Sequence, residues 1–345
     1  MIFDIKNIIK LTSIPISQVI RNLVIVLLMT KTMSIAEVGI WGQVLAVHAF
    51  LYMLINLNLT HAMSRFFPVM SSDKVRISEI FYGISTVVLA NSILVSIILI
   101  IFDIFFSQLF FKSEEYSGVI WLLTIFILLE NIYNNIYSLF RSLQEFHQQA
   151  KLVIYRSFFE LFIIGGGIIF FSYSNLLSIN IIFYLFFLSL IFVIIVGLII
   201  AFKSKLLVLT APKFYFLKKY LNFGVPQLPA SLSHWSINLS DRLIIGYYLG
   251  LDNLGVYFIA NRLSSILTFP LTPIGTMLYT GFSKKHDNGE VINENKILIV
   301  YSVAIISFSV LMYWFIGNFI HLLVDSNQKE ILDLVFFMMI SMVLL

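Results

Sequence analysis

Ten mostly apolar stretches follow one another along the chain, and nine of them are about as long as a membrane is thick. The hydrocarbon core of a bilayer needs about 20 apolar residues in a helix that crosses it. Lipid offers the backbone no hydrogen-bond partner, so each stretch is expected to be helical. We expect helices over residues 11–29, 40–59, 80–102, 119–140, 152–173, 181–202, 221–240, 255–278, 297–320 and 331–345.

The composition agrees with a polytopic membrane protein. Hydrophobic residues make up 59% of the chain and charged residues 12%, against roughly one half and one quarter in soluble domains. The first apolar stretch has no small-residue cleavage site after it, so we expect a retained helix and not a signal peptide. The absence of cysteine excludes thiolate zinc sites, thiol nucleophiles and disulfides.

Lysine and arginine are distributed unevenly between the two sides of the expected helices. Cytoplasmic loops of membrane proteins are enriched in these residues. With a cytoplasmic N-terminus, 15 of the 22 lie on the cytoplasmic side, four outside and three within helices. We therefore expect a multi-pass protein of the bacterial cytoplasmic membrane with its N-terminus inside. The same bias explains the net charge of +4 without nucleic acid as a partner.

A short pattern recurs at an offset of 216 residues. Gly39-Ile40-Trp41 follows the first expected helix, and Gly255-Val256-Tyr257 follows the seventh. Six helices separate the copies, so both halves have the same orientation and are related by an axis along the membrane normal. We expect an all-α polytopic membrane protein with two pseudo-symmetric six-helix bundles around a central cavity. The first bundle covers 1–202, a basic cytoplasmic linker covers 203–220, and an incomplete second bundle covers 221–345.

The segment 226–255 carries a polar stripe on an otherwise apolar helix. Five polar residues spaced by three or four positions share one helical face: Gln227, Ser231, His234, Asn238 and Asp241. A membrane helix that borders a wet cavity has this pattern. We therefore expect this helix to form a wall of a transport path. The dipeptide Asp241-Arg242 at its outer end has a second interpretation, namely a clamp that fixes the following loop.

Ionisable side chains also lie deep inside the expected helices, where a charge costs about 2.5 to 3.5 kcal/mol on insertion. They are Arg21 in the first helix, Glu130 in the fourth, Arg156 and Glu160 in the fifth, and Arg262 in the eighth. Three arginines around one cavity would make it cationic, which suits phosphate or pyrophosphate. Neutral amides on the polar stripes suit sugar hydroxyls: Asn131, Asn134, Gln227 and Asn238.

Simpler interpretations of the same residues stay open. Arg156 and Glu160 are four residues apart and can form a structural ion pair within their helix. His234 can be a hydrogen-bonded packing residue instead of a proton relay. The sequence has no Gly-rich phosphate loop followed by Lys and Ser or Thr, so we expect no cofactor and no ATP hydrolysis. Energy would come from an H⁺ or Na⁺ gradient, from the membrane potential or from downstream consumption of the product.

The residues from Asp241 to Gly246, followed by Leu254-Gly255-Val256-Tyr257, resemble the motif that opens the second half of Wzx-type O-antigen flippases. These belong to the multidrug/oligosaccharidyl-lipid/polysaccharide exporter superfamily. Other positions that resemble the pattern are Glu37 to Trp41, Arg65 and Arg141. The family usually has at least twelve helices, so we expect a chain that is truncated within its tenth.

This resemblance implies two six-helix bundles around a central cavity. It also implies translocation of an undecaprenyl-pyrophosphate-linked oligosaccharide from the cytoplasmic to the periplasmic leaflet, for O-antigen, lipopolysaccharide or capsule synthesis. Partners would be the lipid bilayer, a polysaccharide polymerase and a chain-length regulator.

Three alternatives remain from the sequence. A cation-coupled multidrug exporter of the same superfamily would need an acidic, aromatic cavity, whereas arginine outnumbers acid in the first, fifth and eighth helices taken together. A membrane-embedded polymerase or glycosyltransferase usually has a long outer loop, and here the longest outer connection is 103–118. A non-transporting scaffold would not need repeated polar faces.

Overall fold

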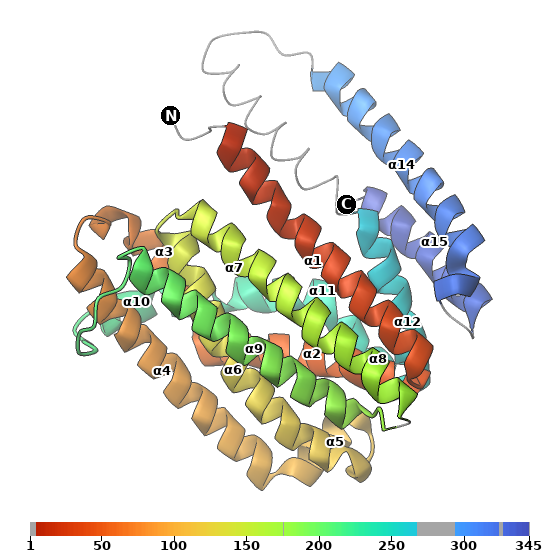
Figure 1. Cartoon of the computed structure of the whole chain (residues 1–345), viewed down its shortest axis with the longest axis horizontal. Helices are drawn as coiled ribbons and strands as arrows, with labels where there is room; N and C mark the ends of the chain where they lie inside the picture. The colour runs from red at the N-terminus through yellow and green to blue at the C-terminus, as the bar shows by residue number, and fades with distance from the viewer. Residues whose placement is uncertain (1–4, 175, 268–293, 324–326, 345) are drawn as a thin grey trace.

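The computed structural model (Figure 1) describes residues 5–174, 176–267, 294–323 and 327–344. Within these ranges the chain is helical and has no strand. Five helical segments there are long and apolar enough to cross a membrane. The protein is therefore an all-α polytopic membrane protein, as its apolar stretches predict. The five segments are Ile35–Asn56, Lys74–Ile101, Glu114–Ser142, Phe146–Tyr173 and Ile179–Lys203.

The described helices follow the order of the apolar stretches, with short helices added between them. Those of the first 203 residues are α1 (Ile5–Thr32), α2 (Ile35–Asn56), α3 (Leu59–Phe66), α4 (Lys74–Ile101), α5 (Asp103–Phe111), α6 (Ser117–Ser142), α7 (Phe146–Phe159), α8 (Gly166–Tyr173) and α9 (Ile179–Lys203). The later ones are α10 (Leu217–Gly224), α11 (Leu228–Tyr248), α12 (Leu251–Ser264), α14 (Glu294–Leu323) and α15 (Gln328–Leu344). The part of the expected 255–278 helix beyond residue 267 lies outside the described residues.

Helix caps explain where the helix limits differ from the apolar stretches. α2 begins at Ile35, five residues before the apolar stretch, because Ser34 and Glu37 form a capping box. The Ser34 hydroxyl accepts from the Glu37 N–H at 3.3 Å, and the Glu37 carboxylate accepts from the Ser34 N–H at 3.1 Å. α2 ends where Leu57 and Asn58 adopt left-handed φ values of 50° and 56°. The chain then continues as α3.

Three short helices occupy segments that hydropathy leaves as connections or does not separate. α5 lies in the expected outer connection; its nine residues span about 13 Å, too little to cross the bilayer. α3 lies at the inner end of α2. The expected seventh helix is divided into α10 and α11 by a 3₁₀ turn, Val225–Gln227, that contains Pro226, because proline cannot donate a backbone hydrogen bond. α11 then continues eight residues beyond the expected end at Ser240.

The expected fifth helix contains a local change of helical pitch. α7 and α8 are joined without a break by a π-helix, Glu160–Gly165. Such segments are rare and frequently occur at functional sites. In this protein the π-helix begins at an ionisable residue, Glu160, that is buried in the molecule.

α2 and α12 cross at the two glycines of the sequence repeat. A Cβ atom on Gly39 would lie 2.0 Å from the carbonyl oxygen of Leu251, and one on Gly255 would lie 2.1 Å from the carbonyl oxygen of Ile35. Both contacts have the same 216-residue offset, so the crossing is reciprocal. Each glycine lies one turn from the start of its helix, at the end that the charge distribution predicts to be outside.

The remaining helices surround this crossing. Figure 1 shows α1 and α7 running side by side with α9 next to α7, while α14 and α15 lie together at the opposite edge of the molecule. α2 also packs along α11 and against α6. Trp41 of α2 stacks on Phe186 of α9 at 4.3 Å between ring centroids, and its edge meets Phe126 of α6 at 5.6 Å. This aromatic cluster forms the wall of the cavity described next.

Candidate functional site

A cavity of about 160 Å³ lies between α1, α2, α6, α7, α9 and α12. Its lining residues are Arg21, Asn22, Ile25, Val26, Trp41, Leu45, Phe126, Glu130, Arg156, Glu160, Phe186, Phe258 and Arg262. Counted from the predicted outer helix ends, Arg21, Glu130 and Arg262 are 11 to 13 residues deep. That is about 16 to 20 Å at 1.5 Å per residue, close to the middle of a 30 Å hydrocarbon core.

Four charged side chains in the cavity form a continuous chain of ion pairs. Glu160 receives Nε of Arg21 at 3.1 Å on one carboxylate oxygen and Nε of Arg156 at 2.6 Å on the other. Arg156 also donates to both carboxylate oxygens of Glu130, through Nη1 at 3.2 Å and through Nη2. The predicted pair of Arg156 and Glu160 within one helix is present, and the structure extends it to two further helices. These four charges compensate one another.

Arg262 adds a charge that this chain of ion pairs does not neutralise. It forms no ion pair with the described part of the chain. Its guanidinium lies over the ring of Phe258 at 4.9 Å. Its Nε and Nη1 of Arg21 are buried and have no hydrogen-bond partner among the described residues. Buried donors are nearly always paired, so these two nitrogens are the free donors of the cavity.

Three arginines and two glutamates line the cavity, which gives it a net charge of one positive unit when all five are ionised. Arginine stays protonated in proteins. The aromatic walls exclude water, and charge interactions are stronger in such surroundings than in water. The volume is below the roughly 300 to 1,000 Å³ of pockets for drug-sized ligands. The arrangement can therefore hold one small anionic group at mid-membrane depth.

The predicted polar stripe of α11 is divided between different surroundings. Gln227, Ser231 and His234 line a separate groove of about 510 Å³ between α2 and α11. The Asn238 amide instead donates to the carbonyl oxygen of His234 at 2.7 Å. Asp241 lies one turn further along the helix, in neither of the two cavities.

The Asp241-Arg242 dipeptide connects α11 with α12. The Tyr257 hydroxyl donates to the Asp241 carboxylate, and Arg242 Nη2 donates to the Asn261 side-chain oxygen at 3.1 Å. Arg242 is buried, and its guanidinium lies 5.3 Å from the ring of Phe258, on which Arg262 also lies. These contacts fit the second interpretation of the dipeptide, a clamp between neighbouring helices, which also holds Phe258 against the cavity.

The amides of α6 do not face the arginines. Asn131 is fully buried and donates to the hydroxyl of Ser92 on α4 at 2.9 Å, so it connects two helices. Asn134 is half-buried one turn beyond Glu130 and lines neither cavity. The sequence reasoning missed the aromatic wall and Asn22, whose side-chain oxygen accepts from Arg21 at 3.0 Å. The position of Asn22 next to Arg21 was the available signal.

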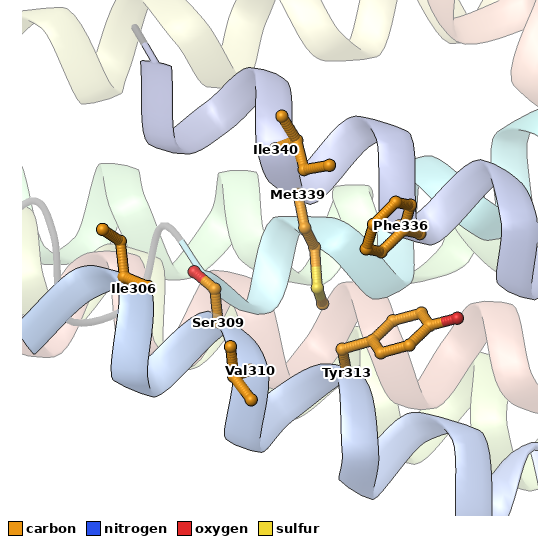
Figure 2. A pocket seen from close by; sticks show the side chains of 7 residues that line it. All are labelled: Ile306, Ser309, Val310, Tyr313, Phe336, Met339 and Ile340. Carbon is orange, nitrogen blue, oxygen red and sulfur yellow. The ribbon is translucent and has the colours of Figure 1, made fainter.

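A third pocket, of about 370 Å³, lies between α14 and α15. Figure 2 shows its seven side chains, among which the Tyr313 ring lies close to Phe336. No charged residue lines it, and the hydroxyl of Ser309 donates to the backbone of its own helix at 2.8 Å. An apolar pocket of this kind cannot compensate an anion. The cavity with the ion pairs is therefore the candidate site.

Comparison with known proteins gives the family. A family model described as polysaccharide biosynthesis protein matches residues 5–286. The chain belongs to this family. The Wzx-type polysaccharide and O-antigen flippases are members of the polysaccharide biosynthesis protein family, so the resemblance of the sequence motifs is confirmed. No curated protein and no solved structure matches the chain significantly.

Membership supports a role in polysaccharide synthesis as a transporter or flippase. The matched residues include every helix that lines the buried cavity, from α1 to α12. A membrane protein of this polysaccharide biosynthesis family therefore contains a mid-depth cavity with an excess of arginine.

Proposed function

We propose that this protein is a flippase for oligosaccharide repeat units linked to undecaprenyl pyrophosphate. It moves them from the cytoplasmic to the periplasmic leaflet of the bacterial cytoplasmic membrane, for O-antigen or capsule synthesis. The observation that carries the proposal is the mid-depth cavity in which two buried guanidinium nitrogens of Arg21 and Arg262 have no partner among the described residues.

The physical difficulty of the reaction is the diphosphate. An isolated charge in hydrocarbon is costly, and a small ion moved from water into a medium of low dielectric constant loses on the order of 20 kcal/mol by idealised estimates. Guanidinium groups offset this cost with charge-assisted and bidentate hydrogen bonds to phosphate oxygens. Arg21 and Arg262 supply such donors from α1 and α12 at the depth where the cost is greatest.

The ion-pair chain gives the cavity a state without substrate. Glu160 and Glu130 compensate Arg21 and Arg156, which keeps the burial of four charges affordable. An arriving diphosphate competes with Glu160 for Arg21 and recruits the uncompensated Arg262. The α2–α12 crossing closes the side on which those helices begin, so release requires the crossing to open. Transport by alternating access follows from these two states.

A cation-coupled multidrug exporter is the second candidate, because four aromatic side chains line the cavity and would suit apolar drugs. The charge separates the two functions. An exporter of cationic drugs needs an acidic cavity, whereas three arginines face two glutamates here. Cationic dyes are therefore expected not to be exported by this protein.

The test uses the native host. The gene is deleted, and the leaflet that holds undecaprenyl-linked oligosaccharide is determined with a non-permeant sugar-modifying enzyme on inside-out vesicles. Complete repeat units accumulating on the cytoplasmic face, and cleared when the gene is restored, support the flippase. Complete units that already face outward, or no accumulation at all, would contradict it. Sensitivity of the deletion strain to cationic drugs would instead favour the exporter.

A further inference from the structure

The groove between α2 and α11 is chemically different from the arginine cavity. Eleven residues line it: Ala49, Tyr52, Met53, Asn58, His61, Gln227, Ala230, Ser231, His234, Trp235 and Leu239. None of them is lysine, arginine, aspartate or glutamate. Six carry neutral hydroxyl, amide or imidazole groups, and Trp235 adds a large aromatic surface. With about 510 Å³, the groove falls within the size range of small-molecule sites.

The aromatic and polar groups of the groove are held in place by contacts on both helices. The Trp235 indole N–H donates to the Ala46 carbonyl oxygen at 3.2 Å, and the ring packs on Phe50 at 4.9 Å. Asn58 donates to Ser231 at 3.0 Å across the α2–α3 break. These contacts fix the two walls relative to each other, which is what a pre-formed binding site needs.

The groove and the cavity lie on the same face of α2, one above the other. Trp41 and Leu45 line the cavity, whereas Ala49 and Tyr52 line the groove. The spacings of four, four and three residues keep these positions on one helical face. Leu45 and Ala49 differ by about 6 Å along the helix axis. A ligand with its anionic group at the arginines can therefore place the next chemical group in the groove.

We propose that this groove binds the neutral sugar part of the substrate, while the arginine cavity binds its phosphate part. The inference rests on the proposed function and divides that substrate between two sites. A cation-free groove cannot compensate phosphate. Its six polar side chains make it a poor site for an isoprenoid chain, since covered polar groups lose their hydrogen bonds to water. Sugar hydroxyls both donate and accept, as the amide, hydroxyl and imidazole groups here can.

The structure also explains why the whole substrate does not fit the arginine cavity. That cavity holds about 160 Å³, which suits a headgroup but not several sugar rings. The residues with sugar-like complementarity from the polar stripe, Gln227 and Ser231, lie in the groove. The division into two sites thus follows from where α11 places its stripe.

The test uses the full chain in lipid nanodiscs and two soluble probes. The first is the oligosaccharide released by mild acid from the host's lipid-linked pool, followed by saturation-transfer NMR, which detects weak binding. The second is inorganic pyrophosphate, followed by calorimetry. The variant carries His61→Ala and His234→Ala, because both side chains are exposed in the groove. The matched control carries His147→Ala and His321→Ala, two exposed histidines outside it.

We expect the groove variant to bind the oligosaccharide at least tenfold more weakly than the control, with unchanged pyrophosphate binding. Retained pyrophosphate binding also shows that the variant is folded. Pyrophosphate binding without oligosaccharide binding in the wild type, or equal oligosaccharide binding by variant and control, would overturn the inference and leave the flippase proposal standing. Displacement of the oligosaccharide by sugar-free undecaprenyl phosphate would also overturn it. Binding of neither probe would remove both proposals.

Discussion

Replacing Gly39 by alanine should open the crossing of α2 and α12. The new Cβ atom would lie 2.0 Å from the carbonyl oxygen of Leu251, whereas ordinary contact begins near 3.4 Å. The two helices must therefore separate by about 1.4 Å, because the obstacle is backbone and cannot rotate away. Overpacking of this kind costs about 1 to 3 kcal/mol. The closed arrangement should then become about 5- to 150-fold less populated relative to the open one.

The reciprocal contact makes this prediction sharper. Gly255→Ala places its Cβ 2.1 Å from the carbonyl oxygen of Ile35, so it should shift the equilibrium by a similar amount. One separation of the helices relieves both clashes. The double variant should therefore cost little more than either single one, which is the non-additivity expected of residues in contact.

Spin-label distances provide the assay. The chain has no cysteine, so labels on Lys31→Cys and Asn253→Cys, which are exposed on α1 and α12, have no background. We expect Gly39→Ala to transfer population from the short to the long distance. Gly166→Ala is the matched control, because nothing lies within 4 Å of its added Cβ. An unchanged distance distribution with wild-type transport would refute the role assigned to the crossing.

Three further substitutions test the charged network and the helix clamp. Arg21→Ala removes a donor worth about 1.5 to 3 kcal/mol to a charged ligand, so flipping should fall at least tenfold in the leaflet assay while insertion stays intact and Arg21→Lys retains part; full complementation by Arg21→Ala would contradict this. Glu160→Gln leaves two buried arginines with a weaker partner and should lower thermal stability by about 3 to 5 kcal/mol, while tightening pyrophosphate binding in calorimetry. Tyr257→Phe removes the donor to Asp241 and should lower the thermal unfolding temperature without changing pyrophosphate affinity; a changed affinity would place Asp241 in the transport path.

Hydropathy predicted the helices well because lipid makes the same demand on every span. It missed α5 and α3, since a helix that does not cross the bilayer carries no such signal. It also placed the start of α2 at residue 40, although Ser34 and Glu37 carry a capping-box pattern that the sequence displays. Helix limits are set by such local hydrogen bonds and not by apolarity.

The arginines of the candidate site could be predicted individually, but their pairing could not. Arg21, Arg156 and Arg262 stand out because a charge at membrane depth needs a reason. That Glu130 pairs with Arg156 depends on how α6 packs against α7. The stripe of α11 gave a single face, yet Ser231 meets Asn58 and Asp241 meets Tyr257, since the two ends of the helix have different neighbours. Sequence spacing defines a face and does not identify what packs on it.

The central claim is that the uncompensated arginine of the mid-depth cavity carries an anionic headgroup across the membrane. Its most direct test is flipping of fluorescent undecaprenyl-pyrophosphate-linked oligosaccharide by the purified chain in proteoliposomes, read out as dye accessible to a non-permeant quencher. The account predicts flipping by the wild type, a loss of at least tenfold with Arg262→Ala, and partial activity with Arg262→Lys. Wild-type rates with Arg262→Ala, or no difference from protein-free vesicles, would contradict it.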